Sequence, residues 1–298
     1  MRRWTAACAA ALMGVVLVQP AAGQTTSLAG IIDFHVHSGP DSRPRSVGDL
    51  EIARIAKRAG MRGLVFKNHF TMTADRAWLA MEEVPGIDIF GGVALNHSVG
   101  GLNAEAVRQM VAFSGGRGKV VWLPTFDAEF WMTRAGDPGP FVPVMRNGEM
   151  DPALGEIFDL IAEHDLVLAM GHSSPEEVLA LIPEARARGV EQILVTHGLG
   201  QSPTPDQLRA MADHDVVIEL VWLAVMNGQF SYADYAEAIR EYGARHFLLS
   251  SDLGQAGNPL HPDGLNALMD GLRGEGVSDT EIDVMIRDNP ARLLGLDP

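Results

Sequence analysis

The sequence predicts an α/β protein, an eight-stranded (β/α)8 barrel of the TIM type, from three observations. Short apolar stretches of strand character alternate with stretches of helical periodicity along the chain. Eight such strands are expected, the number that closes a parallel barrel. Polar residues that can bind a metal follow most of them, at the end of the strands where this fold carries its chemistry. No G-x-G-x-x-G or Walker-type loop favours the alternative, an open doubly wound sheet.

The elements follow one another in order. The expected strands are 31–37, 63–69, 87–95, 119–125, 166–170, 192–196, 216–222 and 246–251. The expected helices are 49–59, 73–83, 103–113, 152–164, 175–188, 205–213, 231–242, about 263–273 and 279–294. The segment 126–150 shows no clear period and contains three prolines, so it is expected to be irregular.

The first residues have the layout of a secretory signal peptide. Arg2 and Arg3 precede an apolar run, and small residues end at Gly23, where cleavage is expected. The run is shorter than the roughly 20 residues that a membrane span needs. We therefore expect residues 24–298 to form a single barrel domain that is secreted or periplasmic, with no membrane partner.

Composition narrows the class of function. Loss of residues 1–23 would take the formal net charge from −15 to −17, which makes a nucleic-acid partner unfavourable. Cys8 is the only cysteine and would leave with the signal peptide. Any metal must then be held by His, Asp, Glu or Lys.

The chain is organised around the stretch IIDFHVHSGP at 31–40. With a period of two, Asp33, His35 and His37 are expected on one face of a strand and Phe34 and Val36 on the other. Two imidazoles at the end of one strand can reach the same ion, and neutral imidazole is the commonest protein ligand for zinc-like metals.

Six of the ten histidines follow expected strands and should meet at one rim of the barrel. They are His35, His37, His69, His97, His172 and His197. The last strand ends in Ser-Ser-Asp252, which adds a carboxylate. His164, His214 and His246 are expected at the opposite end, with structural roles.

In this order, the H-x-H, the two later histidines and the final aspartate resemble the amidohydrolase superfamily of metal-dependent hydrolases. The ending NPARLLGL at 289–296 also resembles the C-terminal helix of that superfamily. The resemblance implies one divalent ion, expected to be zinc, on His35 and His37 with Asp252. It implies a second ion on His172 and His197, with Asp252 as the base that acts on the attacking water.

The bridge between two such ions departs from the superfamily pattern. Lys119 stands at the wrong end of its strand to be a carboxylated bridging lysine. Lys67, which alternation places on the inward face of an apolar strand, is one candidate, and Asp127 and Glu129 are others. The alternatives for Lys67 are a substrate-facing or ion-paired group and a lysine whose amine reaches solvent.

Three further histidines have open roles. His69 is expected as a metal or substrate contact, or as a group that orients another by a hydrogen bond. His97 and His261 are weaker candidates for the rim.

These residues favour hydrolysis of an amide, lactone or ester-like bond in a small molecule by a metal-activated water. The alternatives are a metal-dependent decarboxylase of a small aromatic acid, and a metal or ligand binder without turnover. The apolar residues of 126–142 suit a lid over an apolar substrate, and Arg43, Arg45 and Arg134 are candidates for contact with a substrate carboxylate. A homo-oligomer is compatible with the sequence.

Overall fold

The strands form one parallel sheet that curls into a nearly closed barrel. A computed structural model describes residues 28–297. The barrel strands are β1 (Ile32–Val36), β2 (Gly63–Phe66), β3 (Asp88–Ala94), β4 (Gly118–Trp122), β7 (Val167–Ala169), β8 (Gln192–Val195), β9 (Val217–Val221) and β10 (Phe247–Ser250). Each pairs in parallel with the next, in the order of the chain. The (β/α)8 prediction is confirmed.

The barrel closes between its first and last strands. The amide of Asp252 donates to the carbonyl of His35 at 3.1 Å, and the amide of His37 donates to the carbonyl of Leu253 at 2.9 Å. A parallel bridge between Val36 and Leu253 marks the same place. The end of β1 and the residues after β10 are therefore neighbours through their backbones.

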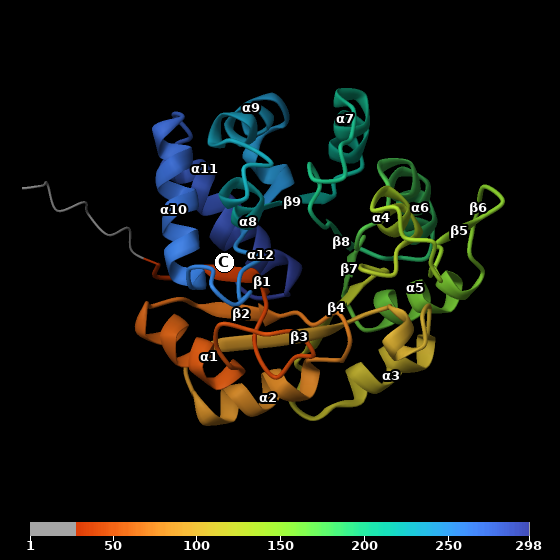
Figure 1. Ribbon diagram of the computed structural model, residues 1–298, viewed down its shortest axis with the longest axis horizontal. Helices are drawn as coiled ribbons and strands as arrows, with labels where there is room; N and C mark the ends of the chain where they lie inside the picture. The colour runs from red at the N-terminus through yellow and green to blue at the C-terminus, as the bar shows by residue number, and fades with distance from the viewer. Residues whose placement is uncertain (1–27, 298) are drawn as a thin grey trace, which may run out of the picture.

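Helices surround the strands on the outside (Figure 1). They are α1 (Asp49–Arg58), α2 (Ala74–Glu83), α3 (Ala104–Ala112), α4 (Glu129–Arg134), α5 (Ala153–Glu163), α6 (Pro175–Ala187), α7 (Pro205–Asp213), α8 (Trp222–Met226), α9 (Tyr232–Tyr242), α10 (His261–Gly274), α11 (Asp279–Asp283) and α12 (Asn289–Leu293). Local sequence fixes where several of them begin. In α6 the hydroxyl of Ser174 accepts from the amide of Glu177 while the Glu177 carboxylate accepts from the amide of Ser174, and Pro175 occupies the first turn.

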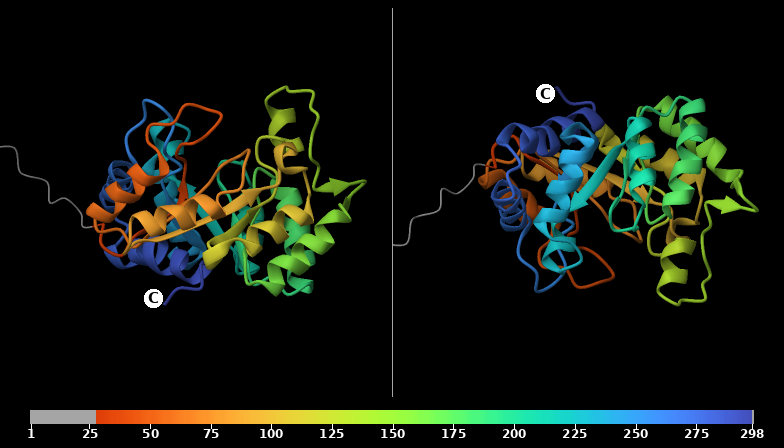
Figure 2. Two further views of the ribbon diagram at one scale, coloured as in Figure 1. Left: turned by 90° about the horizontal axis from the view of Figure 1, so that it is seen from below. Right: turned by 90° about the horizontal axis from the view of Figure 1, so that it is seen from above.

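Two apolar clusters divide the core. The inner cluster fills the barrel with side chains from every strand, among them Ile32, Val65, Trp122 and Leu248. Residues of α12 join it, so the C-terminal helix covers one end of the barrel. In the left panel of Figure 2 the C-terminus lies on the opposite side from the loops that follow β1 (red-orange) and β4 (yellow-green). The functional end of the barrel is therefore the end away from α12.

Several expectations need correction. Segment 126–150 is not irregular throughout: it forms α4 and a hairpin of β5 (Met145–Arg146) and β6 (Glu149–Met150). These elements are too short to show a period in the sequence. The helix expected over 279–294 is divided by a π-helical turn at Val284–Asp288 into α11 and α12. The short helix α8, which follows β9 directly, was not predicted.

The strict alternation expected for β1 is also wrong. Phe34 lies with Ile32 in the inner cluster, whereas Val36 belongs to the outer one. The pairing of β1 with β2 shifts register between Asp33 and Val36, and such an irregularity lets successive side chains turn to the same side. Asp33 instead accepts from the backbone amides of His35 and Ser251, at 3.3 and 3.0 Å.

Candidate metal centre

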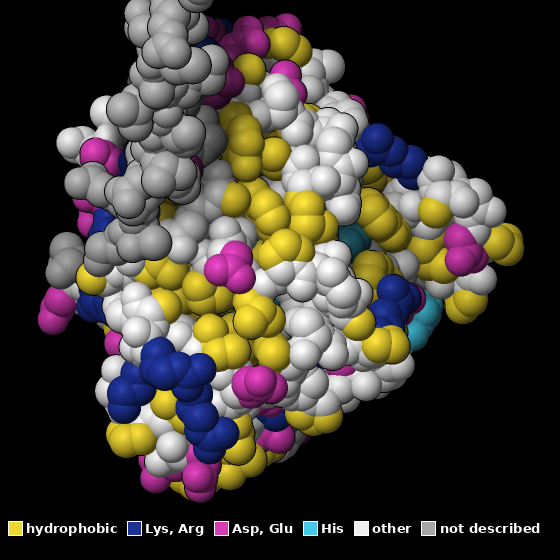
Figure 3. All heavy atoms as spheres, turned by 60° about the vertical axis from the view of Figure 1, so that its left-hand side comes forward, with side chains coloured by type: hydrophobic (Ala, Val, Ile, Leu, Met, Phe, Trp, Pro, Cys, Tyr) yellow, Lys and Arg dark blue, Asp and Glu magenta, His cyan; other side chains and the backbone are white. Residues whose placement is uncertain are grey.

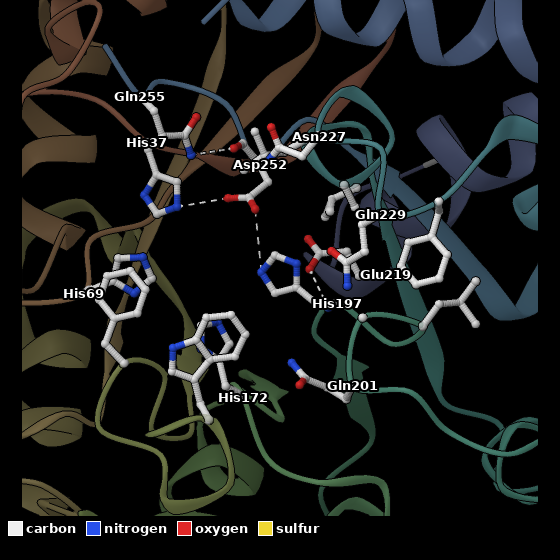
Figure 4. Close-up of a pocket in the computed structure, with 18 of the residues that line it drawn as sticks. His37, His69, His172, His197, Gln201, Glu219, Asn227, Gln229, Asp252 and Gln255 are labelled. Atoms are coloured by element: carbon white, nitrogen blue, oxygen red, sulfur yellow. Dashed lines mark hydrogen bonds and ion pairs between the residues drawn. The ribbon is translucent and has the colours of Figure 1, made fainter. Parts of the chain in front are cut away.

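A cavity of about 630 Å³ opens at the end of the barrel where the strands terminate. Its polar lining includes His37, His69, His172, His197 and Asp252, which come from five different strand ends (Figure 4). The sequence placed these five residues at one rim, and the structure brings them together. On the face shown in Figure 3, histidine side chains (cyan) take up little of the surface, and most of this group is buried.

His35, His37 and Asp252 converge at the floor of the cavity. Oδ1 of Asp252 lies 3.1 Å from Nε2 of His35 and 3.1 Å from Nε2 of His37. All three residues are buried. Within residues 28–297, this trio is one of two groups of His and acidic side chains with ligand atoms close enough to share an ion, and the other is His35, His197 and Glu219.

The outer nitrogens of both histidines are held by groups that accept hydrogen bonds. Nδ1 of His35 lies 3.0 Å from the Glu219 carboxylate, and Nδ1 of His37 lies 3.0 Å from the carbonyl of Lys67. A carboxylate and a carbonyl accept from an N–H, so each ring carries its proton on Nδ1 and turns an unprotonated Nε2 toward Asp252. Histidine ligands of metal ions are oriented by partners of this kind.

The protonation states agree with this assignment. Burial lowers the pKa of His35 well below its usual value and lowers that of His37, although the nearby Asp252 opposes both shifts. Burial raises the pKa of Asp252, but the surrounding His35, His197 and His37 outweigh it and hold that pKa below its usual range. These directions favour an ionised Asp252, while burial alone disfavours a charged ring at His35 and His37.

This donor set fits a divalent cation. Nε2 of His37 and Oδ1 of Asp252 lie 3.1 Å apart, and both are acceptor atoms. A positive ion bound to both would stabilise this arrangement. Imidazole nitrogens with one carboxylate are a ligand set typical of zinc.

Lys67 reaches the same floor from β2. Its Nζ lies 3.0 Å from Nε2 of His35, and its side chain is fully buried beside the Trp122 ring, with 5.4 Å from Nζ to the ring centroid. Burial lowers the pKa of Lys67 to about 8. The inward orientation predicted for this lysine is confirmed. No carboxylate of residues 28–297 lies within ion-pair distance of it.

His197 and His172 continue the cluster on the other side of Asp252. Nε2 of His197 lies 3.7 Å from Oδ2 of Asp252, and the His172 and His197 rings are 5.4 Å apart. His197 has a φ of 50°, a conformation that is unfavourable outside glycine and is often retained at functional sites. Nδ1 of His172 is buried without a hydrogen-bond partner among residues 28–297. Within residues 28–297, no acidic group completes a compact ligand set around His172.

His69 is fixed by a polar network and an aromatic stack. Its Nδ1 lies 2.9 Å from Oγ1 of Thr125, and Asn96 donates to both Thr125 Oγ1 and the His69 carbonyl. The His69 ring stacks on Phe126 with 3.8 Å between centroids. Its second nitrogen is left facing the cavity, so an orienting partner and a free ring atom coexist in this residue.

The structure excludes several weaker candidates from the cavity lining. Asp127 accepts from the amide of His97 at 2.7 Å, and Glu129 lies at the start of α4, so neither approaches the floor. His97 is exposed and contacts the Pro140 carbonyl. His261 is wrong as a rim residue, because it is fully buried and its Nε2 lies 2.9 Å from the carbonyl of Leu253.

Two residues that line the cavity were not predicted. Glu219 lies within β9, and its side chain faces the barrel interior. Gln201 was not singled out: only 4% of it is exposed, it lines the cavity, and its Oε1 has no partner in the described part of the chain. Glu219 lies two positions after Val217 on the same strand, and Val217 faces the barrel interior. This alternation is the one signal in the sequence that points to Glu219.

Comparisons with known proteins identify a family and a shared fold. Residues 30–219 match the model of a "Family of unknown function (DUF6282)". No curated protein matches the sequence.

Solved structures share the fold. A probable 2-pyrone-4,6-dicarboxylic acid hydrolase from Acinetobacter baumannii, with citric acid bound, has a TM-score of 0.61 and 13% identity, over 90% of this chain and 100% of that one. An amidohydrolase from Burkholderia multivorans with bound zinc has a TM-score of 0.60 and 13% identity, again over 90% and 100%. An amidohydrolase from Pseudomonas aeruginosa has a TM-score of 0.59 and 12% identity, over 90% and 96%. The neighbours are members of the superfamily that the sequence resembles, and they confirm the barrel fold.

Proposed function

We propose that this chain, which belongs to the family of unknown function DUF6282, is a metal-dependent hydrolase that uses a metal-activated water to cleave an amide, lactone or ester-like bond of a small molecule. One observation carries the proposal: two buried imidazoles, each with its proton fixed on Nδ1, face one oxygen of Asp252 at 3.1 Å. Two histidines with a purely structural role would not need to turn their unprotonated Nε2 atoms toward the same carboxylate oxygen.

His35, His37 and Asp252 would hold the first ion, and His197 with His172 would hold a second. When bound, a zinc-type ion lowers the pKa of water from about 15.7 toward about 7 and polarises a carbonyl oxygen. Asp252 would accept a proton from the attacking water and return it to the leaving nitrogen or oxygen, which completes hydrolysis. Glu219 keeps His35 in the tautomer that can act as a ligand.

Lys67 suits the bridge between two ions. Addition of carbon dioxide to its neutral amine would form an N–C bond, release a proton and give a carboxylate attached to Nζ, which lies beside His35. Asp127 and Glu129 are turned away from the floor, which supports Lys67 over them. His69, with its free ring nitrogen on the cavity, would contact the substrate or its leaving group.

The comparisons support a hydrolase of this kind without naming its substrate. The Burkholderia neighbour carries zinc, and the Acinetobacter neighbour is named as a hydrolase of a cyclic ester. Both are distant in sequence, so the metal and the reaction of this chain remain part of the proposal.

Metal analysis together with a substrate screen tests it. The purified mature protein should contain about one or two zinc-type ions, and it should hydrolyse at least one compound from a panel of amides and lactones, with activity lost on chelation and restored by zinc. A native protein without metal, or activity indifferent to a chelator, would sink the proposal. Release of carbon dioxide from an aromatic acid would indicate the decarboxylase instead.

Export is a separate part of the proposal. The expected signal peptide, residues 1–23, lies outside the described residues, and no helix within 28–297 is long and apolar enough to cross a bilayer. Intact mass of the protein from a secreting host should show a mature chain that begins at Gln24. A product retaining Met1 in the cytoplasm would contradict secretion to the periplasm or beyond.

A further inference from the structure

Three arginines line the cavity, and the structure separates them by what they already bind. Arg45 pairs with Asp41 through two of its nitrogens, each 2.7 Å from Oδ2. Arg134 donates to the Gly200 carbonyl and to the Ser202 hydroxyl, both at 3.3 Å. The guanidinium of Arg43 has neither a hydrogen bond nor an ion pair within residues 28–297. Its donors are therefore available to a ligand.

Arg43 is nevertheless held in place. Its Cζ lies 4.3 Å from the centroid of the Phe126 ring and 5.7 Å from that of Phe70. A guanidinium above an aromatic ring is attracted by the electron-rich face, while the N–H groups around its edge stay free to bind a carboxylate by two parallel hydrogen bonds.

The same ring connects Arg43 to the floor of the cavity. Phe126 stacks on His69 at 3.8 Å with 24° between the planes, and His69 stacks on His37 at 5.0 Å with 27°. Arg43, Phe126, His69 and His37 thus form one column that runs from the mouth of the cavity to a candidate metal ligand. A group bound by Arg43 lies at a defined separation from the site where the bond is to be cleaved.

The opposite wall has a different character. Val221, Leu223, Ala224 and Phe230, from the end of β9 and the segment after it, line the cavity there. At the floor, Asp252 and Glu219 are acidic and would repel an anionic group that approached without a counter-charge. The cationic column and the apolar wall therefore require a ligand with a charged end and an apolar body.

We propose that the substrate is a carboxylate-bearing amide or lactone with an apolar, ring-containing body, and that Arg43 is the residue that binds its carboxylate. The inference rests on the proposed hydrolase function for the identity of the cleaved bond. It does not need that function for the binding of the carboxylate itself, because Arg43 contacts no candidate metal ligand directly.

Calorimetric titration with benzoate tests the proposal on the full mature chain, with benzamide as the uncharged probe of the same shape. Benzoate should bind the wild-type protein, and Arg43→Gln should weaken it about tenfold or more, as expected for a hydrogen-bonded pair of charges. Arg43→Lys should retain part of the affinity because the charge stays and the two-pronged geometry is lost. Benzamide should not distinguish the variants.

Arg117→Gln is the matched control. Arg117 also lies over a ring, 5.1 Å from the centroid of Phe90, but it does not line the cavity, so its loss should leave benzoate binding unchanged. Every titration is repeated on chelator-treated protein, where benzoate cannot bind a metal. Equal benzoate affinity in the wild type and Arg43→Gln, or no binding to the wild type, would overturn the role of Arg43. If Arg43→Gln weakens benzoate binding but the native protein contains no metal or hydrolyses no amide or lactone, the proposed function is overturned and the role of Arg43 is kept.

Discussion

Oε1 of Glu219 lies 3.0 Å from Nδ1 of His35, on strands that are 184 positions apart in the chain. The same oxygen accepts from the Ser250 hydroxyl at 2.8 Å, and Oε2 accepts from the amide of His197 at 3.2 Å. One buried carboxylate thus orients a histidine of each half of the proposed metal centre.

Replacement of Glu219 should therefore act through the metal. In Glu219→Gln the amide NH2 group would face an N–H donor in either orientation, so the contact with His35 or the contact with His197 would be lost. We expect metal affinity to fall by about 10- to 100-fold with the fold retained. Competition with a chromophoric chelator measures the affinity, and circular dichroism checks the fold. Glu237→Gln, on the exposed face of α9, is the control. Unchanged affinity in Glu219→Gln would show that the His35 contact is structural only.

Lys67 gives a second test. Lys67→Met keeps much of the buried volume but cannot form a carbamate, so it should lose the second ion and most activity. Lys67→Ala should behave likewise, and a short carboxylic acid with high bicarbonate should partly restore its activity by supplying the missing carboxylate. Metal counting and turnover are measured in the same samples. Lys119→Ala, whose Nζ reaches only the Asp165 carbonyl, should be unaffected. Full metal occupancy in both Lys67 variants would exclude the bridge.

Asp252 combines two roles that substitution can separate. Asn retains a carbonyl oxygen for the ion but cannot take a proton, so Asp252→Asn should keep the fold and much of the metal while turnover falls by about 10²- to 10⁴-fold. Asp252→Ala should also weaken the ion at His35 and His37. Near-normal turnover of the Asn variant would remove Asp252 as the base, and His69, with its free nitrogen on the cavity, would be tested next.

Gln201 offers a test that needs neither metal nor substrate. Its buried Oε1 has no partner among residues 28–297, so Gln201→Met should leave the free energy of unfolding unchanged or raise it by about 1 kcal/mol. Gln255 is the matched control, because its carboxamide bonds both the Asp252 carbonyl at 2.8 Å and Asn258 at 3.1 Å. Gln255→Met should lower the free energy of unfolding by about 1 kcal/mol. Denaturant titration compares the two, and equal losses would contradict the unpaired state of Gln201.

The barrel and most of its rim could be predicted because their signals are local. The periodicity of a strand or helix depends on residues close together in the sequence. A histidine that directly follows a strand must lie at the end of that strand. His37, His69, His172, His197 and Asp252 line the cavity for this reason. Lys67 follows the same logic, since alternation with Val65 turns it inward.

The remainder depends on relationships between distant segments. The side to which Glu219 points follows from the register of β9 against β8 and β10, which the sequence of β9 alone does not specify. The placement of Phe34 and Val36 on opposite sides accompanies a register shift against β2. The burial of His261 results from the packing of α10 against the loop after β10, where it contacts the Leu253 carbonyl. Which of the three arginines is unpaired likewise depends on partners such as Asp41 and Ser202.

The hydrogen bonds that join His35 and His37 to Asp252 and Leu253 have a consequence for how the chain matures. The proposed ligands lie at opposite ends of the sequence and meet only where the last strand docks on the first. A partly synthesised or truncated chain that lacks β10 cannot assemble this ligand set, and an ion that binds only the closed barrel would stabilise that closed state. Binding of the ion would then indicate that the barrel has closed between β1 and β10.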